Sequence, residues 1–355
     1  MVDIYLRAMG HYIPAKRLTN DDVMRILEED NRDILSEEEL KFAHYGNKRK
    51  LEFLGGETRA VVGENEGYVD MAVQAAQRAI ENAGMTPDQL DGIIATGISN
   101  PLREPSLSAV VAHEIGLNSG TFFDINDACN GFMKSMRVAS LYIESGRCGN
   151  VLIVACESPF EMKGPLQADL RVEHVGQIDN KFSNLMLGSG AGACILSAQG
   201  EGRRLVDLNE KMESDDWDAS LITFPGIKIP MTRYGKTALS GFWTDARKIS
   251  SKWRQESVRF VLESMKEWGT GVNDYDLVLL HQLGDNVTFS IMKQLNIDKD
   301  KAPLNTFNEL GNLGAANIPV LLSIASEKQV ARTGHTVLLI SGGGGFSYSA
   351  AHIAW

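Results

Sequence analysis

The chain of 355 residues repeats itself at a single offset of 185 residues. Residues 79–97, AIENAGMTPDQLDGIIATG, and residues 264–282, SMKEWGTGVNDYDLVLLHQ, share one pattern of helix end, turn and buried strand. Residues 146–155 match residues 331–340 in the same register without a gap. Chance likeness between two helix–turn–strand units is the alternative, and the constant register argues against it. We therefore expect an internal duplication.

Each repeat pairs an amphipathic helix with a short apolar strand. Residues 69–84 and 254–269 carry apolar side chains at helical spacing, and each segment is followed by a Val, Ile and Leu run bounded by Gly and Asp. Strands that are apolar throughout are typical of sheets covered by helices on both faces. The sequence therefore predicts a layered α/β fold built from two similar units.

The boundary between the two units is expected after the Gly-rich residues 190–200. We expect residues 1–200 to form one domain and residues 201–355 to form the other. Residues 160–182 and 208–245 lack clean periodicity and are rich in Gly, Pro and charge, so we expect loops that cover a site or a partner subunit.

Composition excludes several classes of function. The 35 Lys and Arg residues are outnumbered by 46 Asp and Glu, and the net charge of −11 disfavours binding to nucleic acid. The sequence contains no uncharged apolar run of the ~18 residues that a membrane span needs and no signal-peptide pattern, so we expect a cytoplasmic protein. Cys129, Cys148, Cys156 and Cys194 form no metal-ligand or disulfide pattern.

Cys129 lies where a predicted strand passes through a short turn into a long helix, in TFFDINDACNGFMKSMRVASLYIESG. A helix N-terminus stabilises a thiolate, so this position predicts a lowered thiol pKa and a nucleophile. Taken alone, a cysteine at a helix start is more commonly a small buried hydrophobe, which is how we interpret Cys148, Cys156 and Cys194.

Two polar residues of the second half favour the catalytic interpretation. His281 ends the apolar run DLVLLH, at the carboxyl end of a predicted strand, where open α/β sheets place reactive groups. Asn312 lies in ELGNLGAANIPV, before a helix that corresponds to the Cys129 helix at the 185-residue offset. Each could singly be structural, His281 as a capped core histidine and Asn312 as a turn residue. Together the three residues predict one site.

Four consecutive glycines, residues 342–345, lie between two predicted strands near the C-terminus. A phosphate loop would open a helix and carry a Lys-Ser/Thr pair, which is absent, so a backbone oxyanion hole or a simple tight turn is expected.

These motifs resemble the ketoacyl-ACP synthase III-like condensing enzymes of the thiolase superfamily, along almost the whole chain. DACNGF resembles the nucleophile turn of that family, HQ at 281–282 its histidine motif, GNLGAANIP its asparagine motif and GGGGFSYSAAHI its C-terminal glycine loop. The resemblance implies a thiolase-like duplicated αβαβα layered sandwich. It also implies a homodimer that takes acyl thioesters on CoA or acyl carrier protein and uses no metal or redox cofactor.

The resemblance further implies that Cys129 is acylated and that a second acyl unit attacks it as a carbanion. His281 and Asn312 would then hydrogen-bond the second thioester carbonyl, and the Cys129 N–H with Gly345 would stabilise the other oxyanion. One departure is HQLG in place of HQAN, where Gly284 replaces a side-chain amide.

A second departure is Glu104, in PLREPSLSA, where fatty-acid-priming members usually carry a bulky apolar residue next to the nucleophile. Burying a carboxylate is costly unless it is paired or functional. We expect Glu104 to be the base that removes an α-proton from an acyl thioester, which allows Claisen condensation without decarboxylation. The ketosynthases that this chain resembles in carrying such a glutamate make pyrone, cyclohexanedione or head-to-head β-keto products, so the resemblance implies a product of this kind. The alternative is a surface glutamate preceding a helix cap.

Three alternative functions remain open: malonyl-ACP-dependent priming of fatty acid synthesis, acyl transfer or hydrolysis without condensation, and a non-catalytic role in a heterodimer. Acidic groups of the carrier would need basic partners, for which Lys248, Lys252, Arg254 and Lys293 are candidates. Such residues are more commonly only a solvated helix face.

Overall fold

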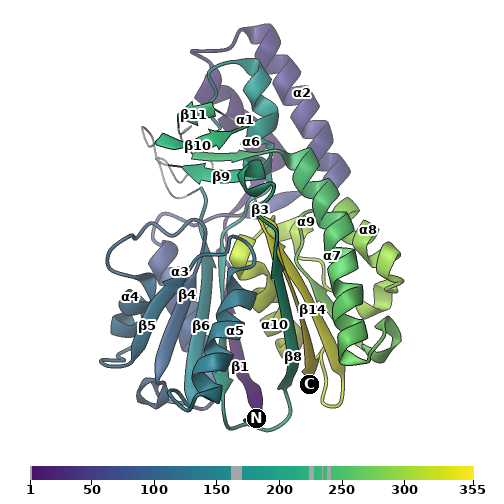
Figure 1. The fold of residues 1–355 in the computed structure, drawn as a ribbon. Helices are drawn as coiled ribbons and strands as arrows, with labels where there is room; N and C mark the ends of the chain where they lie inside the picture. The colour runs from purple at the N-terminus through teal and green to yellow at the C-terminus, as the bar shows by residue number, and fades with distance from the viewer. Residues whose placement is uncertain (1, 161–169, 224–227, 234, 238–240) are drawn as a thin grey trace.

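The computed structural model describes residues 2–160, 170–223, 228–233, 235–237 and 241–355. Its centre is a nine-stranded sheet with the order β13-β14-β15-β8-β1-β7-β6-β4-β5 (Figure 1). The strands of this sheet are β1 (Ile4–Tyr12), β4 (Gly92–Thr96), β5 (Thr121–Ile125), β6 (Asn150–Glu157), β7 (Gly190–Ser197), β8 (Arg204–Met212), β13 (Leu277–Leu280), β14 (Thr336–Gly343) and β15 (Ser347–Ala354).

The strand order is a near-mirror image about the β1–β8 pair, which is only two residue pairs long. On one side β6 pairs with β4 in parallel and with β7 antiparallel; on the other, β14 pairs with β13 in parallel and with β15 antiparallel. The strands β4 and β13 begin at Gly92 and Leu277, which are 277 − 92 = 185 residues apart. The predicted duplication is confirmed.

Helices cover the two half-sheets in layers. They are α1 (Asn20–Asn31), α2 (Glu37–Leu54), α3 (Tyr68–Asn82), α4 (Leu107–Glu114), α5 (Gly131–Glu144), α6 (Ile178–Lys181), α7 (Ala246–Trp268), α8 (Asp285–Leu295), α9 (Phe307–Leu310) and α10 (Asn317–Glu327). One apolar core joins α3 and α4 to the first half-sheet, and another joins α7 and α8 to the second. Between the half-sheets α5 and α10 share the largest core. The layers therefore run α-β-α-β-α, as expected.

Equivalent residues of the two halves have the same structural roles. Gly84 and Gly269 both adopt positive φ, +62° and +69°, where the helices α3 and α7 end, a conformation that costs glycine little. The Asp91 carboxylate accepts a hydrogen bond from Gly149 N (2.8 Å) at the start of β6. Asp276 accepts one from Thr336 N (2.8 Å) at the start of β14 in the same way.

A cap of helices and short strands lies over one end of the sheet (Figure 1). It consists of α1, α2 and α6 with β2 (Arg17–Thr19), β3 (Thr58–Ala60), β9 (Ser220–Thr223), β10 (Lys228–Thr232), β11 (Gly235–Thr237) and β12 (Gly241–Thr244). The α2 helix has strong end signals, because Ser36 and Glu39 form a capping box and Gly55 ends it at φ +85°.

The prediction that 160–182 and 208–245 are loops is wrong for most of their described part. Strand pairs β9–β12 and β10–β11 form in the second segment, and α6 forms in the first. Short strands that pair only with each other leave little periodic signal. Residues 161–169, 224–227, 234 and 238–240 lie outside the described residues.

None of the described helices is long and apolar enough to cross a membrane. The division of the chain into domains at residue 200 stays a prediction; that residue lies between β7 and β8.

Candidate active site

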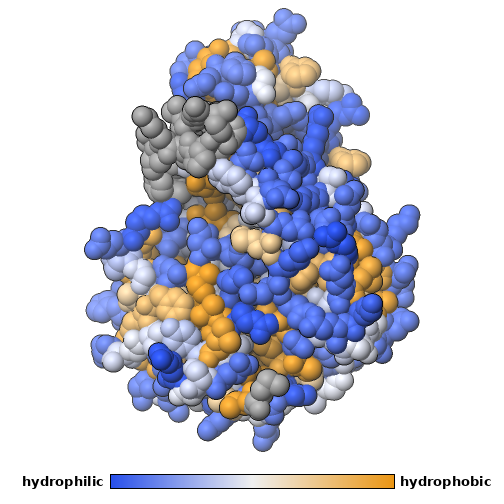
Figure 2. Space-filling view, in the orientation of Figure 1, coloured by the Kyte–Doolittle hydropathy of each residue, from blue (hydrophilic) through white to orange (hydrophobic). Residues whose placement is uncertain are grey.

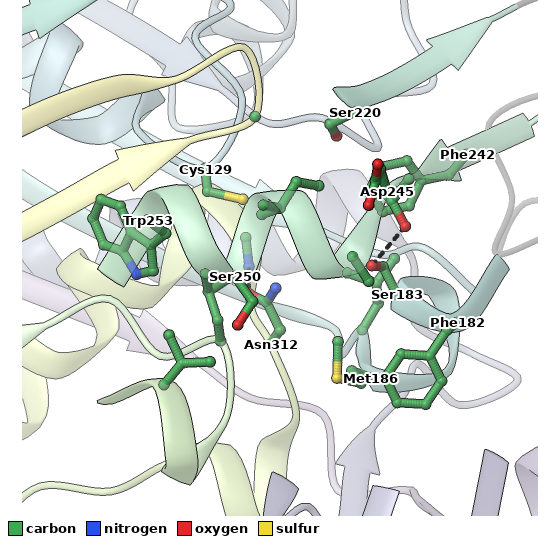
Figure 3. A pocket seen from close by; sticks show the side chains of 18 of the residues that line it. Cys129, Phe182, Ser183, Met186, Ser220, Phe242, Asp245, Ser250, Trp253 and Asn312 are labelled. Carbon is green, nitrogen blue, oxygen red and sulfur yellow. Dashed lines mark hydrogen bonds between the residues drawn. The ribbon is translucent and has the colours of Figure 1, made fainter. Parts of the chain in front are cut away.

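A pocket of about 510 Å³ opens where the cap meets the sheet, and its size and apolar walls are those of a small-molecule site. Cys129 and Asn312 both line it, with side chains of α7 and of the cap around them (Figure 3). The apolar wall includes Leu54, Phe182, Met186, Ile222, Phe242, Leu283 and Val287. Sequence reasoning identified Cys129 and Asn312, whereas most of this apolar wall comes from segments that carried no recognisable motif.

A tight turn presents Cys129 to the pocket. Ala128 adopts φ +47°, an uncommon conformation for a residue with a Cβ, and such strain is often found at functional sites. Asn130 N donates to Asp127 O (3.0 Å), and Asn130 Nδ2 donates to Asp127 Oδ2 and to Ser349 Oγ, both at 3.0 Å. These bonds tie the nucleophile turn of the first half to β15 of the second.

The thiol of Cys129 has a raised pKa, about 12, in the opposite direction from the sequence prediction. Burial is the main cause, and the negative charges of Glu157 and Asp127 add to it. The helix also begins two residues later than expected, at Gly131. Proximity to a helix start therefore does not dominate here, because burial and two acidic neighbours oppose the thiolate.

Asn312 is held by its own backbone and by a turn. Its N–H donates to Met186 O (2.7 Å), and its carbonyl accepts from Gly188 N (2.9 Å). The side-chain Oδ1 accepts from Gly314 N (2.9 Å), which leaves the Nδ2 donor available to a pocket ligand. Gly311, just before it, has φ +76° and ψ −169°, a region open essentially to glycine alone.

His281 lies at the end of β13, as expected, but is only 1% exposed and is not among the residues that line the pocket. Burial lowers its pKa to about 4, with a smaller opposing effect of the Asn317 amide, so the imidazole is neutral near pH 7. Neither ring nitrogen makes a hydrogen bond of standard geometry with the described residues. Such buried orphan nitrogens call for a partner.

The residues that follow His281 have structural partners. Gln282 Oε1 accepts from Thr306 N (2.9 Å) and Phe307 N (3.1 Å), which fixes the chain before α9. Gly284 has φ +140° and precedes α8. Gly284 therefore adopts a backbone conformation that favours glycine, at the position where the family that this chain resembles has a side-chain amide.

The glycine turn packs against the nucleophile turn, but not through the residue that was predicted. A Cβ on Gly343 would lie 2.8 Å from Asp127 O, and one on Gly344 would lie 2.7 Å from Ser220 Oγ. Gly342, Gly343 and Gly344 line the pocket, whereas Gly345, with φ +83°, does not. Its role as an oxyanion donor stays a prediction.

Glu157 is a pocket residue that sequence reasoning missed. It ends β6, is 4% exposed and lines the pocket with Cys129, Ser99 and Asn312. Burial raises the pKa of its carboxyl, against four hydrogen bonds that lower it. The only signal in the sequence is a glutamate at the end of the apolar run NVLIVAC.

Glu104, by contrast, is exposed and does not line the pocket of its own chain. It precedes α4, whose first residues Leu107 and Ser108 donate their N–H groups to Asp124 of β5 at 2.7 and 3.0 Å. The strand β5 is the last strand of the sheet, so the helix that Glu104 precedes is hydrogen-bonded to an edge strand. The expectation of a carboxylate buried beside Cys129 is therefore wrong within one chain.

Of the four candidate carrier-binding residues, only Arg254 lines the pocket. Lys248 pairs with Asp216, and Lys252 contacts Asp216 and Glu213 at 3.4 Å. Lys293 lies on α8, away from the pocket lining. The visible face of α7 is mainly hydrophilic (Figure 2).

Two other basic residues line the pocket. The Arg247 side chain is 92% exposed, and the Lys50 side chain is 43% exposed and pairs with Asp179. No group of three or more His, Cys, Asp or Glu among the described residues could hold a metal ion. The absence of a cofactor stays a prediction.

Comparison with known families finds two matches. The family described as 3-oxoacyl-[acyl-carrier-protein (ACP)] synthase III matches residues 123–162, which include Cys129. The family described as the C terminal part of that synthase matches residues 265–355, which include His281 and Asn312.

Similar curated proteins and solved structures agree with these matches. A β-ketoacyl-[acyl-carrier-protein] synthase III of Desulfitobacterium hafniense (strain Y51) is 26% identical over all of this chain and 98% of its own length. Its counterpart in Neisseria meningitidis is 27% identical, with 96% of each chain covered. OleA of Xanthomonas campestris, solved with lauric acid and lauroyl-CoA, superposes with a TM-score of 0.82 at 20% identity and covers 99% of both chains.

The 3-oxoacyl-[acyl-carrier-protein] synthase III of Aquifex aeolicus superposes with a TM-score of 0.78 at 23% identity, covering 99% of this chain and all of that one. The two superpositions bear out the thiolase-like fold expected from the sequence.

Proposed function

We propose that this chain is a ketoacyl-ACP synthase III-like enzyme of the thiolase superfamily, and that it forms a carbon–carbon bond between two acyl thioesters through an acyl-Cys129 intermediate. The observation that carries the proposal is one apolar pocket that Cys129 and Asn312 both line. Neither ring nitrogen of the buried, neutral His281 makes a hydrogen bond of standard geometry with the described residues, which suits a hydrogen bond to a substrate carbonyl.

The reaction runs in two steps. Cys129 Sγ attacks the first thioester carbonyl, and the carrier leaves as a thiol with the cysteine proton. A base then removes an α-proton from the second acyl thioester. The resulting carbanion, stabilised as an enolate by His281 and Asn312, attacks the acyl-Cys129 carbonyl. The Cys129 sulfur leaves, and the β-keto thioester remains on the second carrier.

The substrate is a fatty acyl or β-ketoacyl group rather than acetyl. Large apolar side chains such as Phe182, Ile222 and Phe242 line the pocket beyond Cys129. A two-carbon unit would leave most of that surface without a contact, whereas each buried methylene contributes about 0.8 kcal/mol. CoA or carrier protein would lie at the mouth, near Arg247 and Lys50.

The base is proposed to be Glu104 of a second copy. A general base must come within hydrogen-bond reach of the proton that it removes, and Glu104 does not line its own pocket. Glu104 precedes α4, which is hydrogen-bonded to the edge strand β5. Phe122 and Phe123 of that strand are only half-buried, and such an edge can pair with another strand. A homodimer joined edge to edge at β5 would bring each Glu104 to its neighbour's side of the interface.

Mixing two inactive variants tests the shared site. Glu104→Gln and Cys129→Ala homodimers each lack one required group, but a mixed dimer has one complete site. Refolding or subunit exchange of an equal mixture should restore about a quarter of the wild-type rate per chain. A mixture as inactive as its parents would show that Glu104 is not shared between chains, and a native mass of one chain would exclude the dimer.

Intact-protein mass spectrometry tests the reaction itself. The enzyme is mixed with acyl-CoAs of increasing length, and the Cys129 adduct is then challenged with a second acyl thioester or with malonyl-CoA. Discharge by the second acyl thioester without CO₂ supports the proposal. Absence of any adduct on Cys129, with Cys129→Ser as the control, would refute it.

A priming ketoacyl-ACP synthase III is the second candidate, favoured by the names of the curated relatives. It predicts that only malonyl thioester discharges the adduct, that CO₂ appears, and that Glu104→Gln is nearly as active as wild type. A cytoplasmic location is proposed for either enzyme.

A further inference from the structure

The buried carboxylate of Glu157 joins three segments around the pocket. Its Oε1 accepts from Ile98 N (2.9 Å), which follows β4, and from Ala315 N (3.2 Å), which precedes α10. Its Oε2 accepts from Ser99 N (3.0 Å) and Ser99 Oγ (2.5 Å). Glu157 itself ends β6. One side chain therefore connects the first half of the duplication to the Asn312 turn of the second.

These contacts exclude a role as the base. A carboxylate offers about four lone-pair positions, and the four donors above occupy all of them. A proton acceptor would first have to break one of these buried, charge-assisted bonds, which are about twice as strong as neutral ones. Glu157 therefore holds its surroundings and does not take a proton from substrate.

The Asn312 turn depends on this carboxylate for its position. Gly314, whose N–H orients the Asn312 amide, packs so closely that a Cβ would lie 2.8 Å from Glu157 Oε1 and 3.0 Å from its Cδ. Ala315, the next residue, donates to the same oxygen. Without the carboxylate, Gly314 and Ala315 would no longer be held in place, and the orientation of Asn312 Nδ2 would change.

We propose that Glu157 is a positioning residue, which ties the Ile98–Ser99 segment to the Asn312 turn and so fixes Asn312 opposite Cys129. The inference rests on the proposed function and deepens it. The condensation step, which uses Asn312, depends on Glu157 more than the acylation of Cys129 does.

The charge of Glu157 provides a second readout, which reports the loss of charge separately from the loss of position. The charged groups that act on the Cys129 thiol are Glu157 and Asp127, both acidic, and burial adds to their effect. Removing one negative charge lowers the thiol pKa. Glu157→Gln should then react with iodoacetamide faster at a fixed pH, by about three- to tenfold, with its pH profile moved to lower pH.

The experiment measures two rates on three variants: alkylation of Cys129 against pH, and condensation with the acyl thioesters above. Glu157→Gln should alkylate faster yet condense at least about tenfold more slowly. Ser99→Ala removes one donor and keeps the charge, so its condensation falls while its alkylation is not faster. Asp91→Asn is the matched control, because Asp91 also accepts two backbone N–H groups on β6, at its other end, and both its rates should stay within about twofold of wild type.

Two results would overturn the proposal: Glu157→Gln condensing as fast as wild type, or Glu157→Gln and Asp91→Asn changing both rates alike. If Glu157→Gln does not fold, Ser99→Ala decides by the same condensation criterion. Alkylation needs no acyl substrate. A wild-type enzyme that never condenses would therefore refute the proposed function, while the shift of the alkylation profile still tests Glu157.

Discussion

Replacing Gly311 by alanine should destabilise the chain and displace Asn312. At φ +76° and ψ −169° the backbone strain of a residue with a Cβ is about 1–3 kcal/mol. The new Cβ would lie 2.7 Å from Met186 O and 2.9 Å from Arg59 Cβ, and overpacking of this kind costs about 1–3 kcal/mol more. The free energy of unfolding should fall by about 2–6 kcal/mol in total.

The same carbonyl accepts the Asn312 N–H, so any shift of Met186 loosens the turn that holds Asn312. Gly334→Ala is the matched control, because Gly334 has φ +90° but nothing within 4 Å of its Cβ position. It should lose only about 1–2 kcal/mol and keep its condensation rate. Urea titrations give the stabilities, and mass spectrometry gives the discharge rate of acyl-Cys129. Equal losses for the two variants would refute the reasoning.

Three further predictions concern pH, chain length and carrier. Because burial lowers the pKa of His281 from 6.5 to about 4, the unfolded chain binds the extra proton between these values. The free energy of unfolding therefore falls by about 3 kcal/mol as pH drops through this window. In urea titrations at several pH values, His281→Asn should lack this part of the pH dependence, and the same pH dependence in variant and wild type would contradict the prediction. Ile222→Trp fills the apolar wall, so long acyl chains should load Cys129 more slowly than short ones in adduct mass spectra, and an unchanged length preference would count against this pocket. Arg247→Glu should raise KM for acyl-CoA more than Lys293→Glu, since of these two residues only Arg247 lines the pocket. Equal increases in KM would show that the carrier does not bind near Arg247.

The ends of helices and strands could be predicted from sequence because their signals occur in both halves of the chain. The helix-ending Gly84 and Gly269, and the strand-tying Asp91 and Asp276, appear in one register and adopt the same roles in both halves. Because such local signals occur twice, they predict the layered fold even though the contacts between the two halves are not known from sequence.

The catalytic roles of Cys129, His281 and Asn312 stay predictions, but their places at strand and helix ends were predicted from sequence, because each follows a strand or precedes a helix within a recognisable motif. Their electrostatics were not. The raised pKa of Cys129 depends on burial and on Glu157, which is 28 residues away in the chain (157 − 129) but shares its pocket. No local sequence pattern shows that these two residues, far apart in the chain, lie in the same pocket.

The sequence alone determined the duplication and the α/β layers, because these follow from periodicity and spacing along the chain. The resemblance to the ketoacyl-ACP synthase III-like family rests on the motifs around Cys129, His281 and Asn312. Only the tertiary structure decided which groups share the pocket. It brought Glu157 into the pocket, left Glu104 exposed outside it, and placed Gly343 rather than Gly345 against the turn that carries Cys129. Those outcomes depend on how two half-sheets and a cap pack together, and packing is set by contacts between residues far apart in sequence.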